Sequence, residues 1–302
     1  MTEIALAARL SRPPILVVPG VYDALTALIG ERAGFEALYI SGASIAYSRL
    51  GRPDIGLVGM SEVVATVSLI HDRVGAHLIV DADTGYGNAL NVQRTVRLLE
   101  RAGASAIQIE DQDFPKRCGH LDDKTLVSAS EMVGKIKAAV DARSSPETLI
   151  IARTDAVAVE GFDRALARAA LYHEAGVDVL FVEAPRRREE LQSIGSRFGR
   201  TVPLMANIVE GGKTPILPAD ELEALGFALV IFPGAVVRLL AKAAQDFYTS
   251  LKTHSSTDPF RARMFDFDAL NDLIGTPDML ERGKRYAGDG PSTKVRKRNE
   301  NV

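Results

Sequence analysis

The chain alternates short apolar runs with longer stretches in which apolar and polar positions recur at helical spacing. Most of the short runs are continuous rather than alternating, which is typical of strands that are covered on both faces. We count eight predicted strands: Ile15–Pro19, Ala37–Ser41, His77–Asp83, Ala106–Asp111, Leu149–Thr154, Val179–Glu183, Pro203–Asn207 and Ala228–Phe232.

The stretches between these runs have the pattern of amphipathic helices. Residues 91–102 are the clearest case, with Val92, Val96 and Leu99 on one face and charged residues on the other. A glycine follows several predicted helices just before the next strand, where it fits a left-handed helix end. These glycines are Gly34, Gly103, Gly176 and Gly226.

Eight strand–helix alternations predict an α/β fold, a (β/α)₈ barrel of the TIM type. An open, doubly wound sheet remains the alternative, because periodicity does not show whether a sheet closes. The first predicted strand is not followed by a Gly-x-Gly-x-x-Gly turn, which argues against the dinucleotide-binding version of that sheet.

The chain continues past the eighth strand with three more predicted helices, at Ala235–Leu251, Asp266–Ile274 and Pro277–Tyr286. We therefore predict a catalytic barrel with a short amino-terminal helix over residues 1–252 and a helical arm over 253–287. A basic, disordered tail is expected over 288–302. Extra apolar helices at a terminus commonly pack on a partner subunit, so a homo-oligomer is expected.

Composition narrows the functional classes. The 302 residues are 46% apolar and 25% charged, and the formal net charge is −3, which is ordinary for an enzyme and provides no field for nucleic acid or an anionic membrane. Residues 1–10 have the pattern of an amphipathic helix rather than a signal peptide, and no run is long enough to span a bilayer. With a single cysteine, the expected compartment is the cytoplasm.

Polar residues gather where the predicted strands end, which is where barrel enzymes place their chemistry. Asp81 and Asp83 end the third strand and Glu110 ends the fourth. Two aspartates alone are more often capping or ion-paired groups. A third acid on the neighbouring strand favours a Mg²⁺ site, since Mg²⁺ takes oxygen ligands and needs only one or two carboxylates directly.

The only cysteine, Cys118, lies in the run Lys116-Arg117-Cys118-Gly119-His120. Flanking cations favour the thiolate, so we expect a lowered pKa for this thiol. The run lacks the second Cys or His pair of a zinc site. Arg153 ends the fifth strand and requires an anion, either Glu183 or a substrate carboxylate.

These segments together resemble the isocitrate lyase/phosphoenolpyruvate mutase superfamily. The resemblance rests on Asp81-Ala-Asp83-Thr-Gly-Tyr-Gly87, Glu110-Asp-Gln112, Arg153-Thr-Asp155 and Glu183-Ala184, and most specifically on the Lys-Arg-Cys-Gly-His run, which is similar to the lyase branch. It implies a (β/α)₈ barrel with a helix swapped between subunits, usually in tetramers.

The resemblance also implies Mg²⁺, with Mn²⁺ as a substitute, bound together with a small carboxylate substrate. Asp83 matches the direct metal ligand, and Asp81 and Glu110 match ligands acting through water. The catalytic positions it implies are Cys118 as the acid, with Tyr39, His120, Arg153 and Glu183. The substrate-binding positions are Ser41, Gly42, Ala43, Asp81, Gly119, Arg153, Asn207 and Arg238.

The implied reaction is a retro-aldol cleavage of a 2-hydroxy di- or tricarboxylate to pyruvate or another 2-oxo acid, with Cys118 protonating the departing carbanion. Arg238 resembles the third-carboxylate arginine of 2-methylisocitrate lyases. The segment around Gly211 is more similar to 2,3-dimethylmalate lyases, so the substrate stays open. The alternatives are a carboxy-phosphoenolpyruvate-type mutase and an oxaloacetate hydrolase; Pro233, where those hydrolases typically have Ser, disfavours the latter.

Overall fold

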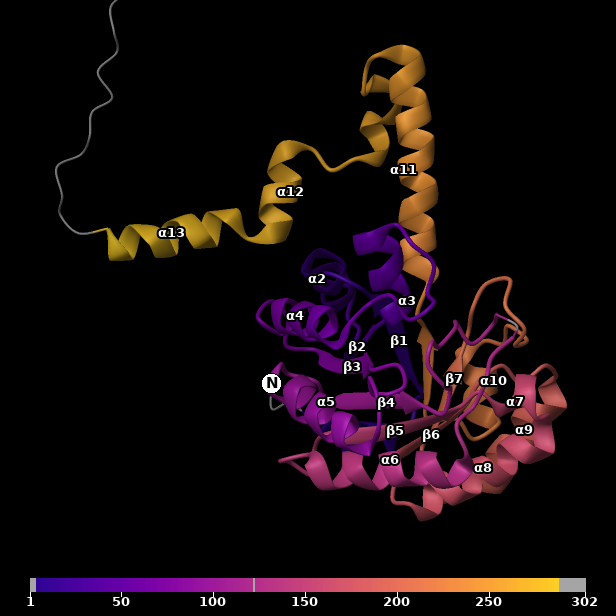
Figure 1. Ribbon diagram of the computed structural model, residues 1–302. Helices are drawn as coiled ribbons and strands as arrows, with labels where there is room; N and C mark the ends of the chain where they lie inside the picture. Colours follow the sequence, from indigo (N-terminus) through magenta and orange to yellow (C-terminus); the bar gives the residue numbers. More distant parts are fainter. Residues whose placement is uncertain (1–3, 122, 288–302) are drawn as a thin grey trace, which may run out of the picture. The chain divides into compact units, whose positions relative to one another are not determined.

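The structure, a computed structural model, describes residues 4–121 and 123–287, and the predicted basic tail lies outside them. Eight parallel strands form a closed barrel in the order in which they occur in the chain, and β1 pairs with β8 to close it. Figure 1 shows the helices arranged around these strands. The predicted barrel is confirmed, and the open sheet is excluded. The strands are β1 (Leu16–Val21), β2 (Ala37–Ile40), β3 (His77–Asp81), β4 (Ala106–Glu110), β5 (Leu149–Thr154), β6 (Val179–Val182), β7 (Leu204–Asn207) and β8 (Leu229–Phe232).

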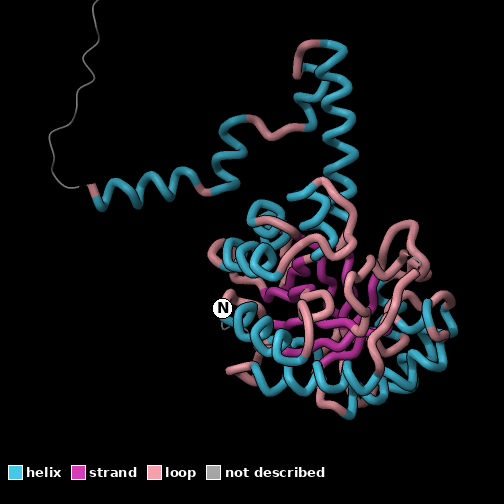
Figure 2. The backbone as a smooth tube through the Cα atoms, in the orientation of Figure 1, coloured by secondary structure: helices cyan, strands magenta, loops and turns pink. Residues whose placement is uncertain are grey.

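Most of the helices that lie between strands in the sequence cover the outside of the barrel, as the tube in Figure 2 shows. The helices up to His254 are α1 (Leu6–Leu10), α2 (Ala24–Arg32), α3 (Gly42–Ile45), the π-helical turn η1 (Ala46–Leu50), α4 (Met60–His71), α5 (Ala89–Arg101), α6 (Ala129–Ala142), α7 (Ala156–Val159), α8 (Phe162–Glu174), α9 (Arg188–Phe198), α10 (Ala219–Ala224) and α11 (Ala235–His254). The 3₁₀ turn η2 (Asp258–Arg263), α12 (Phe267–Ile274) and α13 (Thr276–Tyr286) complete the order.

Local sequence signals set the helix boundaries. Side chains of Asp23, Asn88 and Ser128 accept backbone N–H groups at the starts of α2, α5 and α6, which satisfies donors that the helix leaves unpaired. All four glycines that were expected at helix ends have the left-handed conformation, with φ between +93° and +104°. These caps explain why helix ends could be placed from the sequence.

Two apolar layers hold the barrel together. The inner layer consists of side chains at alternate positions along the strands, such as Leu16, Ile79 and Phe181, and Leu6 and Leu10 of α1 belong to the same cluster. The outer layer packs the other strand faces against the helices. The interior is therefore a filled core rather than a pore, and only the carboxyl-terminal rim is left for polar chemistry.

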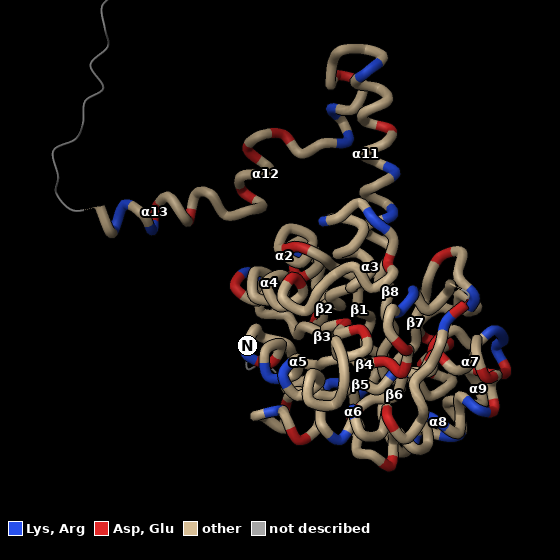
Figure 3. Tube along the Cα trace, in the orientation of Figure 1, with Lys and Arg blue, Asp and Glu red and all other residues tan. Residues whose placement is uncertain are grey.

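The chain divides into two compact units after Lys242, within α11. The second unit carries large exposed apolar side chains on and next to α12 and α13, including Phe267, Leu270, Met279, Leu280 and Tyr286. Along the trace, basic residues are interspersed with acidic ones (Figure 3). Among the described residues, no helix has the length and apolarity that crossing a membrane requires.

Candidate active site

A cavity of about 50 Å³ lies at the rim where the strands end. It brings together side chains from seven strand ends or the loops after them. The predicted site residues that line it are Tyr39, Ser41, Ala43, Asp81, Cys118, Gly119, His120, Arg153, Glu183, Asn207 and Arg238. The other lining residues are Tyr47, Asp54, Lys116, Arg117, Val209, Ile231, Pro233 and Gly234. Gly42, Asp83 and Glu110, which were also predicted, are not among the lining residues.

The two aspartates at the end of β3 face the same region because the strand ends between them. Asp81 is the last residue of β3, and Asp83 has a left-handed backbone with φ +48°. A methyl group placed on Gly42 would lie 3.4 Å from Asp81 Oδ2 and 3.5 Å from Asp83 Oδ1. Gly42 therefore opens the space that both carboxylates border. A non-glycine residue with positive φ is strained, and such strain is common at functional sites.

Lys116 supplies the positive charge next to these acids. Its Nζ lies 2.5 Å from Asp54 Oδ1 and 2.6 Å from Asp83 Oδ1, and all three side chains are buried. Burial would lower the pKa of Lys116, but Asp83 and Asp54 raise it well above its ordinary value. Burial also raises the pKa of Asp83 to about 7, although Lys116 opposes the shift. A buried carboxylate of this kind gains from a nearby cation.

The acid cluster fits a hard divalent cation in its donor chemistry. Asp81, Asp83 and Glu110 offer only oxygen, and Glu110 Oε1 is buried without a hydrogen-bond partner in the structure. Burial raises the pKa of Glu110 well above its ordinary value, which also favours a neighbouring positive charge. Across residues 4–121 and 123–287, no three His, Cys, Asp or Glu side chains converge on one point. Mg²⁺ does not require this, since it keeps several waters.

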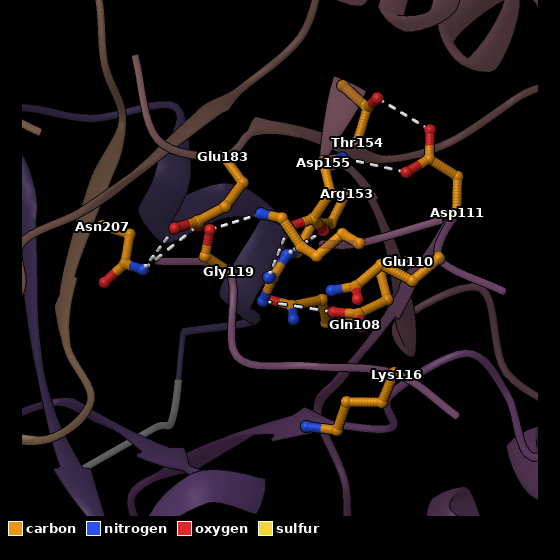
Figure 4. A network of polar contacts seen from close by, with 12 residues as sticks. Gln108, Glu110, Asp111, Lys116, Gly119, Arg153, Thr154, Asp155, Glu183 and Asn207 are labelled. Carbon is orange, nitrogen blue, oxygen red and sulfur yellow. Dashed lines mark hydrogen bonds and ion pairs between the residues drawn. The ribbon is translucent and has the colours of Figure 1, made fainter. Parts of the chain in front are cut away.

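Arg153 is held by acids other than the one predicted. Its Nε and Nη2 donate to Asp155 at 2.8 and 3.0 Å, and its Nη1 lies 3.2 Å from Glu110 Oε2 (Figure 4). The structural partners are thus Asp155 and Glu110 rather than Glu183. Burial would lower the pKa of Arg153, but the surrounding carboxylates, Asp155 foremost, raise it. The guanidinium is a permanent cation in the cavity wall.

Glu183 forms a second polar group with two residues from neighbouring loops and strands. Its Oε1 lies 3.0 Å from His120 Nε2, and both its oxygens accept from the Asn207 amide. The backbone N–H of Lys213 donates to His120 Nδ1, so the imidazole proton belongs on Nε2, facing Glu183. Although burial opposes it, Arg153 and His120 lower the pKa of Glu183, which stays ionised.

The thiol of Cys118 lies in the same cavity, but its expected low pKa is wrong. Burial raises the pKa of Cys118. The flanking cations face other groups: Lys116 is paired with Asp54 and Asp83, and Arg117 lies 3.3 Å from Asp123. Side chains that are adjacent in sequence point in different directions along this loop. The residues next to Cys118 in the sequence therefore did not predict which groups surround its thiol. The thiol holds its proton at neutral pH.

Gly119 allows residues 116–120, which we call the Cys118 segment, to approach the strand ends closely. A Cβ at this position would collide with the Arg153 guanidinium and lie 2.7 Å from Glu183 Cγ. The segment is also fixed by Asp54, whose carbonyl accepts from the Cys118 backbone N–H. A side chain at position 119 would therefore prevent this close approach, a role that is separate from the substrate binding predicted for Gly119.

Tyr39 is connected to the acid cluster through a side chain that the sequence did not single out. Its hydroxyl donates to Gln108 Oε1 at 3.0 Å, and Gln108 Nε2 donates to Asp81 Oδ1 at 3.2 Å. All three are buried, and burial raises the pKa of Tyr39 well above its ordinary value. Ser41 caps α3 by accepting from Ser44, so its position has a structural role as well.

Arg238 already has a carboxylate partner. Its Nη1 lies 2.7 Å from Glu210 Oε2, and both side chains are about half exposed at the outer edge of the cavity. Gly234 leaves room for the guanidinium, since a Cβ there would lie 3.2 Å from Arg238 Cζ. The carboxylate of Glu210 therefore balances the positive charge of Arg238 at this edge.

Three polar residues of the site escaped the sequence analysis. Asp54 lies in the loop between η1 and α4, and Gln108 lies within β4. Lys124 lies in the loop between β4 and α6, well after the end of the strand in the sequence. Asp155 was noted only as part of the Arg153-Thr-Asp155 segment, yet its carboxylate binds both Arg153 and Lys124. Only the glutamine carried a signal, because a polar side chain within an apolar strand needs a buried partner.

Comparison with known proteins agrees with this arrangement. The family model described as phosphoenolpyruvate phosphomutase matches residues 6–252. The chain is 46% identical over 280 residues to 2,3-dimethylmalate lyase of Eubacterium barkeri, covering 92% of this chain and 96% of the relative. It is also 46% identical to 2-methylisocitrate lyase of Aeropyrum pernix, covering 92% and 89%.

Solved structures give the same result. A crystal structure of 2,3-dimethylmalate lyase, a member of the PEP mutase/isocitrate lyase superfamily, matches with a TM-score of 0.88 and 34% identity, over 95% of this chain and 97% of the other. A phosphonopyruvate hydrolase complex with oxalate and Mg²⁺ matches with a TM-score of 0.84 and 29% identity, over 93% and 98%.

Proposed function

The chain belongs to the phosphoenolpyruvate mutase/isocitrate lyase superfamily, and from this we propose that it is a Mg²⁺-dependent carbon–carbon lyase that cleaves a 2-hydroxy dicarboxylate. The products would be pyruvate, or another 2-oxo acid, and a second carboxylic acid. Lyase relatives over nearly the whole chain support the enzyme class. The observation that carries the proposal is that Cys118 lines one cavity with Asp81, Arg153 and Glu183.

The residues that would hold Mg²⁺ are Asp83 directly and Asp81 and Glu110 through water. All three are buried oxygen donors. When bound, the ion would polarise the 2-hydroxyl oxygen of the substrate and stabilise negative charge there. The hydrolase neighbour crystallised with oxalate and Mg²⁺ is consistent with such a site in this superfamily.

The chain's own groups would bind and orient the substrate. Arg153, a permanent cation, would attract one carboxylate, and the Asn207 amide with the His120 Nε2–H would contribute donors near Glu183. Tyr39 donates its proton to Gln108, so its oxygen lone pairs remain available to accept from the substrate hydroxyl. As the 2-hydroxyl loses its proton to water, C2 becomes the carbonyl carbon of the 2-oxo acid and the C2–C3 bond breaks. The electron pair of that bond stays on the departing acid as a carbanion.

Cys118 would protonate that carbanion. A general acid must hold its proton before the bond breaks, and the raised pKa of this partly buried thiol meets the requirement. From the sequence we expected a site that favours the thiolate, but a thiol that keeps its proton is better suited to act as the general acid. After transfer, the thiolate would recover a proton when the products leave.

A dicarboxylate of the 2,3-dimethylmalate type is the substrate that we favour. A tricarboxylate would need a further cation for its third carboxylate, and Arg238 would have to exchange the half-exposed carboxylate of Glu210, 2.7 Å away, for it. 2-Methylisocitrate is the second candidate, because Arg238 lines the cavity and a 2-methylisocitrate lyase is equally identical to this chain.

The test supplies 2,3-dimethylmalate and 2-methylisocitrate with Mg²⁺ and couples pyruvate formation to NADH oxidation. We expect EDTA to abolish activity and excess Mg²⁺, or Mn²⁺, to restore it. Cys118→Ser should lower kcat by about 100-fold or more, since a serine hydroxyl is a far weaker acid. Full activity in that variant would exclude Cys118 as the proton donor. Phosphorus transfer from a phosphonate seen by ³¹P NMR, without pyruvate from either acid, would favour a mutase instead.

We further propose that the protein is a homo-oligomer that exchanges its carboxyl-terminal helices. The exposed apolar side chains of α12 and α13 in the isolated chain support this proposal. Size-exclusion chromatography with light scattering would decide between a monomer and a tetramer.

A further inference from the structure

Lys124 is buried in a way that lysines seldom are. Its side chain is 1% exposed, whereas lysines usually keep their ammonium in water. It follows the Cys118 segment by a few residues and lies before α6. Burying an ammonium is unfavourable unless it is paired and hydrogen bonded, so its contacts should explain why it is there.

Lys124 connects the Cys118 segment to the end of β5. Its Nζ lies 2.8 Å from Asp155 Oδ1 and also donates to the carbonyl of Gly119, the residue that follows the cysteine. Figure 4 shows the Gly119 carbonyl directed toward this group of polar side chains. The same ammonium thus binds a strand-end carboxylate and the backbone next to the thiol.

Asp155 holds Lys124 and Arg153 at the same time. Arg153 donates to both Asp155 oxygens, and the Asp155 backbone N–H donates to Asp111 Oδ1 at 2.9 Å. Although burial would raise it, Arg153 and Lys124 lower the pKa of Asp155 to about 2. This carboxylate is therefore a fixed anion, and two cations are positioned by it.

The loop that carries the Cys118 segment is held at several points, which include Lys116 bound to Asp54 and Asp83 and His120 beside Glu183. Asp113 N–H donates to the Thr125 carbonyl at 2.8 Å, and Val127 N–H donates to the Asp111 carbonyl at 3.0 Å. Of this loop, residues 116–120 line the cavity. There the Lys124 bond holds the Gly119 carbonyl, and the Asp54 carbonyl holds the Cys118 N–H at 3.2 Å.

We infer that Lys124 is a positioning residue, which fixes the Cys118 thiol relative to Arg153 by binding Gly119 and Asp155 together. Its catalytic consequence rests on the proposed lyase function, whereas its effect on the segment does not. Because the thiol must reach one carbon of a substrate anchored elsewhere, a shift of about 1 Å is costly to the rate.

The test replaces Lys124 with methionine, which has a similar length and no charge. Asp155 keeps its two hydrogen bonds to Arg153, so its charge stays compensated and the variant is expected to fold. Lys124→Gln serves as the second variant if methionine does not fold. Arg143→Met is the matched control, because it removes a cation paired at 2.5 Å with Asp178 before β6, away from the Cys118 segment.

The first measurement is alkylation of Cys118 by iodoacetamide, which is unambiguous because the chain has one cysteine. Rates are taken over a pH series so that the limiting thiolate rates are compared. We expect Lys124→Met to react about fivefold faster or more, as is usual when a held segment opens locally, and Arg143→Met to match the wild type. Equal limiting rates in wild type and Lys124→Met would overturn the inference.

The second measurement is lyase kinetics. Since Arg153 keeps Asp155 and Glu110 as partners, we expect KM to change by less than about twofold and kcat to fall about tenfold or more in Lys124→Met, at a Tm matched to the control. A rise in KM with unchanged kcat would contradict the positioning role. A wild type without lyase activity would contradict the proposed function alone, because the alkylation comparison would still report on Lys124.

Discussion

The two ends of the barrel use the same kinds of side chain for different purposes. At the amino-terminal end, carboxylates accept backbone donors that precede the strands: Glu31 binds the N–H groups of Gly75 and Ala76, and Glu100 binds those of Ser144 and Ser145. These acids are partly exposed to water. Their hydrogen bonds close the loops, which is what stability at this end of a barrel requires.

At the carboxyl-terminal end, the charges are buried and less completely satisfied. Asp83 and Glu110 have pKa values raised by burial, and Glu110 Oε1 and Asn207 Oδ1 are buried without hydrogen-bond partners. Such groups cost stability, and they are retained where binding a ligand or ion satisfies them. We therefore expect substitutions at the carboxyl-terminal end to lower activity more than stability. Substitutions at the amino-terminal end should lower stability and leave activity unchanged.

Among substitutions at the two ends, Gly119→Ala at the carboxyl-terminal end is expected to lower activity the most. The added methyl would collide with Arg153 and Glu183, so the Cys118 segment must move outward. We expect kcat/KM to fall by about 100-fold or more, since small displacements of a catalytic group are expensive. The Tm should change little because the segment lies outside the core. Gly134→Ala in α6, where a Cβ meets nothing within 4 Å, is the control. Normal activity in Gly119→Ala would contradict the close approach.

Arg238→Ala should have a smaller effect that depends on the substrate. If the substrate is a dicarboxylate, it has no third carboxylate for Arg238 to bind. Removing this half-exposed cation, which is paired with Glu210, should then change kcat/KM by less than about threefold. For a tricarboxylate, losing a charge-assisted hydrogen bond should cost about 10-fold or more. A large loss with 2,3-dimethylmalate as well would mean that Arg238 contacts the substrates' shared part.

Strand and helix positions could be predicted because each depends on local pattern. Runs buried on both faces marked all eight strands, and glycines and capping side chains marked the helix ends. The predicted strands overran by one or two residues at several ends. Asp83 and Glu183, for example, follow β3 and β6 rather than end them. An apolar run does not show where the ladder of hydrogen bonds stops.

Site partners were harder to predict because they depend on contacts distant in sequence. The pKa of Cys118 was misjudged since Lys116 reaches back to Asp54, 62 positions earlier in the chain. Glu183 was one of the two anions expected for Arg153, the other being a substrate carboxylate, whereas Asp155, two residues on, binds its guanidinium. Strand-end position identified the residues around the cavity, and side-chain direction decided which of them pair.

The smallest effect is expected at the amino-terminal end, from Glu100→Gln. The carboxylate accepts from the backbone and hydroxyl of Ser144, from Ser145 and from Thr148, and an amide can accept at only one of its two ends. We expect about 1 kcal/mol lower stability and a Tm about 2 °C lower, with unchanged kcat/KM. Glu147→Gln, in the same loop and exposed, is the charge-matched control.

The pH dependence of the stability difference between wild type and Glu100→Gln distinguishes a loss of hydrogen bonds from a general effect of removing a charge. Although burial opposes it, the donors of Ser144, Ser145 and Thr148 lower the pKa of Glu100. Its contribution is therefore complete above the unfolded carboxyl pKa and is lost as the pH falls through the lower folded value. Denaturant unfolding should show the gap between wild type and Glu100→Gln narrowing in acid, while Glu147→Gln follows the wild type. A gap that stays constant down to pH values below the folded pKa would mean that the carboxylate does not stabilise this end through its hydrogen bonds.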